Sequence, residues 1–191
     1  LSVQERDALI QADVHNPRPH CEMGYRMLSS FGPFKDVARI IRHHHIHYDA
    51  SLDMEEGEVL LDSHILHLAD RVDVLINPDV FVLKQKASVT EKIRANVSTT
   101  FHPDVFAAFV QASAPDIFWI EINNLELDQL FRLVDSSMNF DLTLENVLDF
   151  ALTISRIIDF RSHFTASHSY TVANLACELG KIFGFSRERC L

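Results

Sequence analysis

Residues 59–76, VLLDSHILHLADRVDVLI, constrain the fold more than any other part of the chain. Drawn as an α-helix, this segment is apolar on nearly every side, and helices of that kind are buried in a core. Asn77-Pro78 follows and ends the helix, because the residue before a proline avoids helical backbone angles. Only five glycines and six prolines interrupt the 191 residues, and strand signals are weak, the best being IFWIEI at 117–122. We therefore predict an all-α fold.

The other apolar patterns along the chain also have helical spacing. The opening segment adds a capping box, with Ser2 as the N-cap and Glu5 three residues later. Short breaks containing proline or glycine separate the helices. Besides residues 59–76, the predicted helices cover 1–12, 21–31, 34–48, 88–98, 102–112, 124–138, 143–160 and 165–185.

The pattern of the chain changes after Ala114-Pro115. We predict a first domain at residues 1–114, linker helices at 115–143 and a second helical part at 144–191. The last part has 48 residues, which is too few to bury a core alone. Its long C-terminal helix is therefore expected to dock on the first part, either within one chain or between two copies in a homodimer.

The composition restricts the class of partner. A formal net charge of −10 argues against a DNA or RNA duplex, which binds clustered Lys and Arg. It also argues against an anionic membrane surface, and no apolar run has the length of a membrane-spanning helix. A metal ion can still bring a phosphate substrate to an acidic protein. The three scattered cysteines form no CxxC pair, which is typical of a reducing cytoplasm.

Residues 40–50, IIRHHHIHYDA, place four of the eleven histidines within five positions. If a helix continues through them, an inward stripe that begins at Val37 reaches His44 and His45, whereas His43 faces solvent. Two adjacent imidazoles on the inner side of a helix have two interpretations. They bind a metal ion, or they are hydrogen-bonded core residues.

Two further residues fit the metal interpretation. Asp70 lies within the apolar segment 59–76, where a buried carboxylate needs a partner or a metal ion. His168 begins an apolar stripe on the predicted C-terminal helix. Neutral imidazole and carboxylate are the usual protein ligands of Fe, Mn and Zn. A partial metal site built from His44, His45 and Asp70 is therefore expected.

Three segments in order, HCEMGYRML, VARIIRHHHIHYDA and LLDSHILHLADRVDVLI, resemble the later half of an HD-GYP domain. HD-GYP domains are a subgroup of the HD metal-dependent phosphohydrolases. That half usually reads H-P-x-x-G, then H-H-E-x-x-D-G-x-G-Y-P, then A-D-x-x-D-A, and TTFHPDVFAAFV resembles its closing G-T-x-F-D-P-x-V helix. The resemblance covers about residues 1–112, and the matching residues are His20, Gly24, His44, His45, Asp49, Ala69, Asp70 and Asp73.

The tail carries a second resemblance. Residues 157–186 are similar to the first helices of another such domain, whose pattern is roughly K-S-x-F-T-x-x-H-S-x-x-V-A. His168 takes the place of the metal-binding histidine of that pattern. The chain is therefore expected to be a piece of a tandem HD protein, with the back half of one domain, a linker and the front helix of the next. A sequence that omits some segments of one domain is the alternative.

The chain departs from the family pattern at three points. No His-Asp dipeptide, which names the superfamily, occurs in the 191 residues. Ile46 stands where the family usually has Glu, and DASLDMEEGE at residues 49–58 replaces the Gly-Tyr-Pro loop. The resemblance therefore implies an incomplete HD-domain-like helical bundle that is inactive by itself and binds metal weakly.

The function that the resemblance implies is hydrolysis of a cyclic dinucleotide, typically cyclic di-GMP, or of another phosphate ester. The cofactor would be a divalent transition metal, Fe, Mn or Zn, with ligands His20, His44, His45, Asp70 and His168. Two alternatives remain. The first is a degenerate, non-catalytic HD module for signalling or dimerisation, and the second is a generic helical interaction domain.

Overall fold

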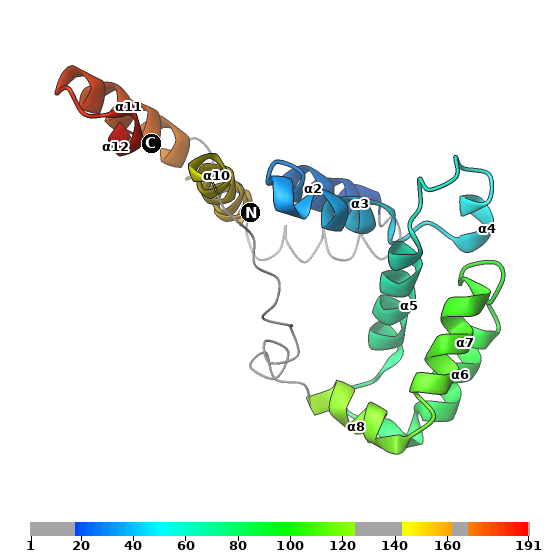
Figure 1. The fold of residues 1–191 in the computed structure, drawn as a ribbon. Coiled ribbons are helices and arrows are strands. Elements are labelled where there is room, and N and C mark those ends of the chain that lie inside the picture. The colour runs from blue at the N-terminus through cyan, green and yellow to red at the C-terminus, as the bar shows by residue number, and fades with distance from the viewer. Residues whose placement is uncertain (1–17, 125–142, 162–167, 191) are drawn as a thin grey trace. The chain divides into compact units, whose positions relative to one another are not determined.

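The structure is a computed structural model that describes residues 18–124, 143–161 and 168–190 (Figure 1). These residues form ten α-helices and two short 3₁₀-helices, and they contain no β-strand. The prediction of an all-α fold is confirmed. The predicted helix at 1–12 and nearly all of the one at 124–138 lie outside the described residues.

The chain divides into two compact units. The first consists of Leu1–Arg39 with Phe140–Leu191, and the second is Ile40–Asn139. The division falls inside α3 (Lys35–His43), which is one continuous helix. The domain boundaries that the sequence predicts, at 114/115 and 143/144, stay predictions.

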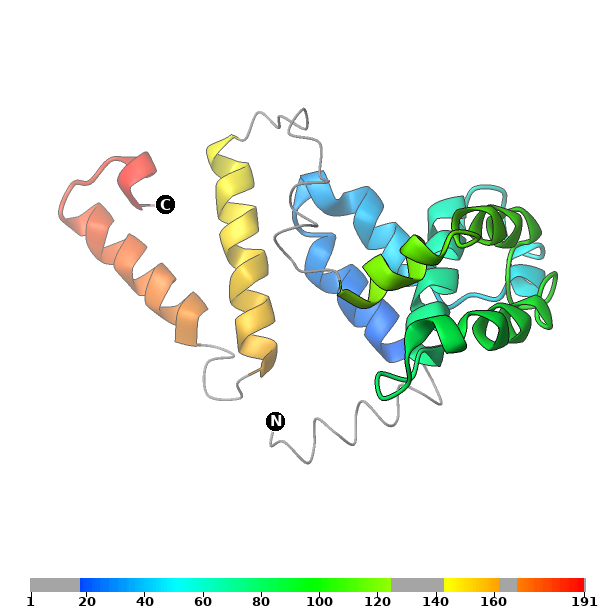
Figure 2. The ribbon, with the colours of Figure 1, turned by 90° about the horizontal axis from the view of Figure 1, so that it is seen from below.

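In the first unit, α10 (Leu144–Arg161) packs on α2 (Arg18–Leu28) (Figure 1 and Figure 2). The Phe31 ring lies 5.3 Å from the Phe150 ring. The hydroxyl oxygens of Ser30 and Thr153 are 3.1 Å apart. This packing joins parts of the chain that are far apart in the sequence, and a short 3₁₀-helix, η1 (Gly32–Phe34), leads from α2 into α3.

The C-terminal helix α11 (His168–Ile182) packs against the short α12 (Arg187–Cys190). Gly184 makes the turn between them at a φ of 74°, which suits a residue without a side chain. The apolar stripe predicted on α11 is real but exposed within the described residues, at Val172, Leu175 and Leu179. The docking of this stripe on the first part of the chain, either within one chain or between two copies, stays a prediction.

The second unit is built around five elements that share one hydrophobic core. They are α5 (Leu61–Leu75), η2 (Val82–Lys84), α6 (Lys86–Arg94), α7 (Pro103–Ala112) and α8 (Asp116–Asn124). The buried core side chains are Leu68, Val72, Val82, Val89, Ile93, Phe101, Val105, Phe106, Phe109 and Trp119.

α5 buries one face instead of its whole circumference. Leu61, Ile65 and Val74 are exposed, so the prediction of a helix buried on all sides is wrong. Two of these side chains, Leu61 and Ile65, border an apolar groove of about 390 Å³ that α5 forms with α7 and α8. The inward face carries Ser63, His64, His67, Leu68 and Val72.

Residues 117–122 carry the best strand signal of the sequence, but in the structure they are part of the helix α8. Trp119 is 0% exposed, and its indole N–H donates a hydrogen bond to the Ser113 carbonyl at 2.8 Å. The Phe109 and Phe118 rings pack edge-on against the indole, at 6.1 and 5.6 Å between centroids. The tertiary contacts of one aromatic residue therefore override the strand propensity of its β-branched and aromatic neighbours.

None of the described helices is long and apolar enough to cross a membrane by itself. The residues Pro103–Ala112 and Asp116–Ile122 reach that length and composition only together, and the pair is bent by 99°. Both helices contribute buried side chains to the core of the second unit.

His102 caps the N-terminus of α7, because its Nδ1 accepts a hydrogen bond from the backbone N–H of Asp104 at 3.2 Å. Its ring also lies 4.8 Å from the Tyr48 ring. We expect His102→Ala to lower the free energy of unfolding by about 1 kcal/mol more than His102→Asn, since Asn keeps a capping oxygen. Urea denaturation followed by circular dichroism measures this difference. Equal losses in the two variants would show that the cap contributes nothing.

Candidate metal centre

α3 ends at His43, so the helix does not continue through the next two histidines. His44 is nonetheless buried, as the helical stripe predicted, and His45 is half-buried. Val37, where the predicted stripe begins, is exposed, and the buried residue of α3 is Ala38. His43 is half-buried, not solvent-facing as predicted. The histidines therefore point inward because of the turn after α3 and not because of helical periodicity.

The tautomer of His44 follows from one short contact. Its Nδ1 lies 2.6 Å from the carbonyl oxygen of Ile41. A carbonyl only accepts hydrogen bonds, so Nδ1 carries the proton and donates it. The lone pair of the neutral ring is then on Nε2, which is the ring atom that a metal ion would bind. Metal-binding histidines commonly donate their other ring N–H to a backbone carbonyl in this way.

The segment that carries these histidines is anchored at both ends by contacts that need no metal. At its start, the hydroxyl of fully buried Ser63 donates to the Ile40 carbonyl at 3.1 Å. At its end, the backbone N–H groups of Tyr48 and Asp49 donate to the carbonyls of residues 100 and 99, at 3.1 and 2.9 Å. These contacts hold the segment against α5 and against the turn that precedes α7.

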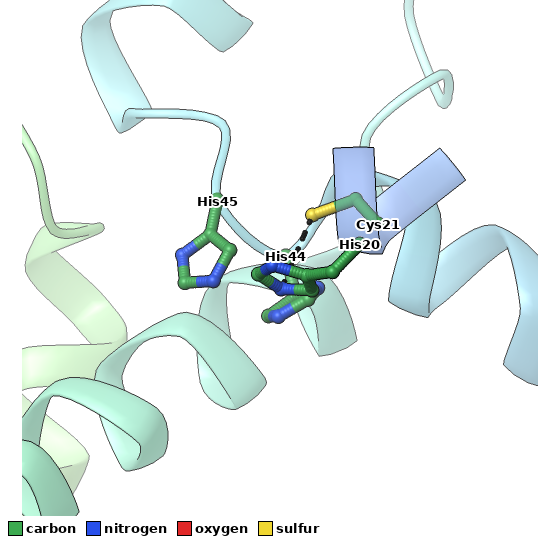
Figure 3. A group of neighbouring side chains, drawn as sticks. All are labelled: His20, Cys21, His44 and His45. Atoms are coloured by element: carbon green, nitrogen blue, oxygen red, sulfur yellow. Dashed lines mark hydrogen bonds between the residues drawn. The ribbon is translucent and has the colours of Figure 1, made fainter. Parts of the chain in front are cut away.

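Figure 3 draws four potential ligands, His20, Cys21, His44 and His45. His20 and Cys21 are adjacent on α2, and His44 and His45 follow α3. The rings of His44 and His45 are 4.1 Å apart, and the Sγ of buried Cys21 is 3.7 Å from Nε2 of His20. Imidazole nitrogen and thiolate sulfur are ligands that Zn and other transition metals accept. A group of this composition can bind such a metal.

His67 on α5 lies beside the same histidines and is only 3% exposed. Its ring centroid is 5.4 Å from that of His45 and 5.9 Å from that of His47. Among the described residues, none offers a hydrogen bond to its buried Nδ1. The pKa of His67 is lowered to about 4, mainly by burial and additionally by the nearby charges of His47 and Arg71. His67 is therefore a neutral imidazole at physiological pH.

This pKa makes stability depend on pH in a defined direction. The ordinary pKa of histidine is 6.5, and that of folded His67 is about 4, so the unfolded chain takes up the proton first as the pH falls. The free energy of unfolding of the metal-free chain should be highest above pH 6.5 and should fall between pH 6.5 and 4, by at most about 3 kcal/mol from this residue. Denaturation at several pH values tests this, and His67→Leu should show a smaller slope. An identical slope in that variant would assign the pH dependence to other groups.

A second aromatic cluster lies next to this one on α5. His64 is buried, and its ring lies 5.5 Å from that of His102 and 5.9 Å from that of Tyr48. Burial lowers the pKa of His64, and the charge of His102 lowers it further. These rings link the end of the histidine segment to α5 and to the start of α7.

Of the five predicted ligands, His44 and His45 lie side by side after α3, and His20 lies on α2 beside Cys21. Asp70 is less buried than the sequence predicts, with 33% of its side chain exposed. Its Oδ2 accepts two hydrogen bonds from Arg71, at 2.8 and 2.6 Å. His168 begins α11 and is exposed. The metal-binding roles of all five residues stay predictions.

Sequence reasoning missed two residues of this region. Cys21 is the neighbour of His20 and stands where the family pattern has proline, so its position beside a candidate ligand was the available indication. His67 precedes Asp70 by three residues, which places both on one side of α5. That spacing could have identified it.

Comparison with known proteins finds one distant relative that is similar over most of the chain. The chain is 24% identical over 184 residues to the 3'3'-cGAMP-specific phosphodiesterase 1 of Vibrio cholerae serotype O1 (strain ATCC 39315 / El Tor Inaba N16961). The match covers 91% of this chain and 42% of the relative, so the chain spans less than half of the relative's length. No family model matches the chain, and no solved structure matches it significantly.

Proposed function

We propose that this chain is part of a metal-dependent phosphodiesterase of the HD superfamily, and that its substrate is a cyclic dinucleotide. Two findings support this. The distant relative is a phosphodiesterase for a cyclic dinucleotide. The residues that resemble the HD-GYP pattern include His20, His44 and His45, which are of a type that binds divalent transition metals.

The observation that carries the proposal is the orientation of His44. Its Nδ1–H donates to the Ile41 carbonyl, which leaves Nε2 with the lone pair. A buried imidazole held in this tautomer, with a second imidazole beside it, is a suitable start of a donor set for Fe, Mn or Zn. Our proposed ligands are His20, His44 and His45 as the central set, with Asp70 and His168 as the additional ligands that the resemblance implies.

A bound divalent metal would supply a Lewis acid, which activates water and polarises a phosphoryl oxygen. The chain itself would do three things. His44 and His45 hold their nitrogens in place through the anchored segment of residues 40–49. Arg71 orients the carboxylate of Asp70 through two hydrogen bonds. The buried wall of α5 limits the access of water to the histidines.

A non-catalytic HD module is the second candidate. The half-buried Ile46 at the family's Glu position and the segment DASLDMEEGE in place of the Gly-Tyr-Pro loop favour it. Metal binding is expected under both proposals, because the histidine group is present in either case. Only substrate turnover separates them.

The test is hydrolysis of 3'3'-cGAMP and of cyclic di-GMP, with products separated by chromatography. The metal-free chain is loaded with Mn²⁺, Fe²⁺ or Zn²⁺, and it is assayed both as the 191 residues and with any native sequence that flanks them. We expect no turnover by the 191 residues, and turnover that depends on His44 once a His-Asp dipeptide is supplied by flanking sequence. If metal-loaded protein with such flanking sequence hydrolyses neither substrate, the non-catalytic module is the correct reading.

A further inference from the structure

His67 differs from an ordinary core histidine because one of its buried ring nitrogens has no hydrogen-bond partner among the described residues. It lies on the inner face of α5 at 3% exposure, and its buried Nδ1 finds no hydrogen-bond partner in the described part of the chain. A buried polar atom without a partner loses its hydration and gains nothing in return, so nearly all such atoms in folded proteins are satisfied. An exception calls for a specific explanation, and a metal ion is one of the few.

A comparison within α5 shows that burial alone does not cause this. His64 lies on the same helix and is also buried, at 6% exposure. Among the described residues, however, Nδ1 of His67 is a buried atom without a hydrogen-bond partner, whereas neither ring nitrogen of His64 is such an atom. The neighbours differ as well, because His64 contacts Tyr48 and His102, whereas His67 contacts His45 and His47.

The distance to His45 suits two imidazoles on one metal ion. A Zn–N bond is about 2.0–2.1 Å, which puts each ring centre about 3 Å from the ion, so two rings on one ion have centres at most about 6 Å apart. The centroids of His45 and His67 are 5.4 Å apart, and the rings meet edge to face at 82°. Each ring therefore lies within the reach of an ion held by the other.

We propose that His67 is a further ligand of the metal centre that includes His45. The resemblance to HD-GYP domains assigns no role to this position. The inference rests on the proposed metal centre, and it extends that centre from the segment after α3 onto α5. α5 then supplies His67 and, one turn later, the proposed ligand Asp70.

The test is a Co²⁺ titration of the chelator-stripped chain, followed by the visible absorption of bound cobalt and by competition with a chromophoric chelator. The variants are His67→Leu and its matched control His64→Leu, which removes an equally buried histidine from the same helix. We expect His67→Leu to weaken cobalt binding at least about 10-fold and to change the cobalt spectrum. His64→Leu should leave both unchanged.

A second measurement separates a ligand from a packing residue. Replacing a buried, unsatisfied imidazole by an apolar side chain of similar size is nearly neutral or stabilising. The metal-free His67→Leu variant should therefore be at least as stable in urea as the wild-type chain. If the variant binds cobalt as tightly as the wild type, or is clearly destabilised without metal, His67 is a structural residue and the inference is wrong.

The outcomes also distinguish this inference from the proposed function. If the wild-type chain binds no cobalt at all, the metal centre itself is absent and both proposals fail. If the wild type binds cobalt and His44→Ala abolishes binding while His67→Leu does not, the metal centre stands and only the role of His67 is refuted.

Discussion

Replacing His44 with alanine is expected to weaken the binding of Zn²⁺ or Co²⁺ by at least about 100-fold. Loss of an outer-shell partner already costs 10–100-fold in metal affinity, and loss of a ligand should cost more. His44 is the histidine whose tautomer the structure fixes, through its 2.6 Å contact with the Ile41 carbonyl. Competition with a chromophoric chelator measures the affinity.

The matched control for this experiment is His47→Ala. His47 belongs to the same segment, only three residues further on, but it is exposed and is not one of the proposed ligands. Its replacement should leave the affinity unchanged. Equal losses in both variants would show that the histidines bind metal as a loose surface tract, without a defined centre.

Replacing Trp119 with alanine is expected to lower the free energy of unfolding by about 3–5 kcal/mol, the range for removal of a buried aromatic side chain. Trp119 is 0% exposed. The substitution removes its edge-on contacts with Phe109 and Phe118 and the hydrogen bond to the Ser113 carbonyl. Trp119 is the one tryptophan of the chain, so urea denaturation should be followed by circular dichroism and not by fluorescence.

Ile117→Ala is the control on the same helix, because Ile117 is 55% exposed. Surface substitutions usually change stability by no more than about 0.5 kcal/mol. If Trp119→Ala costs as little as Ile117→Ala, α8 does not contribute to the core as the structure indicates.

Local sequence patterns predicted two long helices to within two residues at each end. The predicted segment 59–76 is observed as Leu61–Leu75, and the predicted segment 143–160 as Leu144–Arg161. The segment 34–48 is observed only as Lys35–His43. Beyond it, the backbone N–H groups of Tyr48 and Asp49 donate to residues 100 and 99, which lie about fifty positions later and leave no trace in the local pattern.

The candidate site could be predicted in part. The choice of His20, His44 and His45 as ligands came from the resemblance, whereas helical periodicity placed His44 inward on the wrong assumption that the helix continues. Cys21 and His67 were not predicted as ligands, because their significance depends on which side chains the fold brings near. Asp70 was expected to be buried, but it is partly exposed and pairs with its neighbour Arg71.

X-ray absorption spectroscopy of the zinc-loaded chain tests the central claim, a transition-metal centre built from histidines, most directly. We expect one zinc ion per chain, with nitrogen scatterers at about 2.0–2.1 Å and the outer-shell pattern of several imidazole rings. A sulfur scatterer at about 2.3 Å would add Cys21 to the ligands. Zinc that is bound below stoichiometry, or that is surrounded by oxygen atoms without imidazole scattering, would contradict the account.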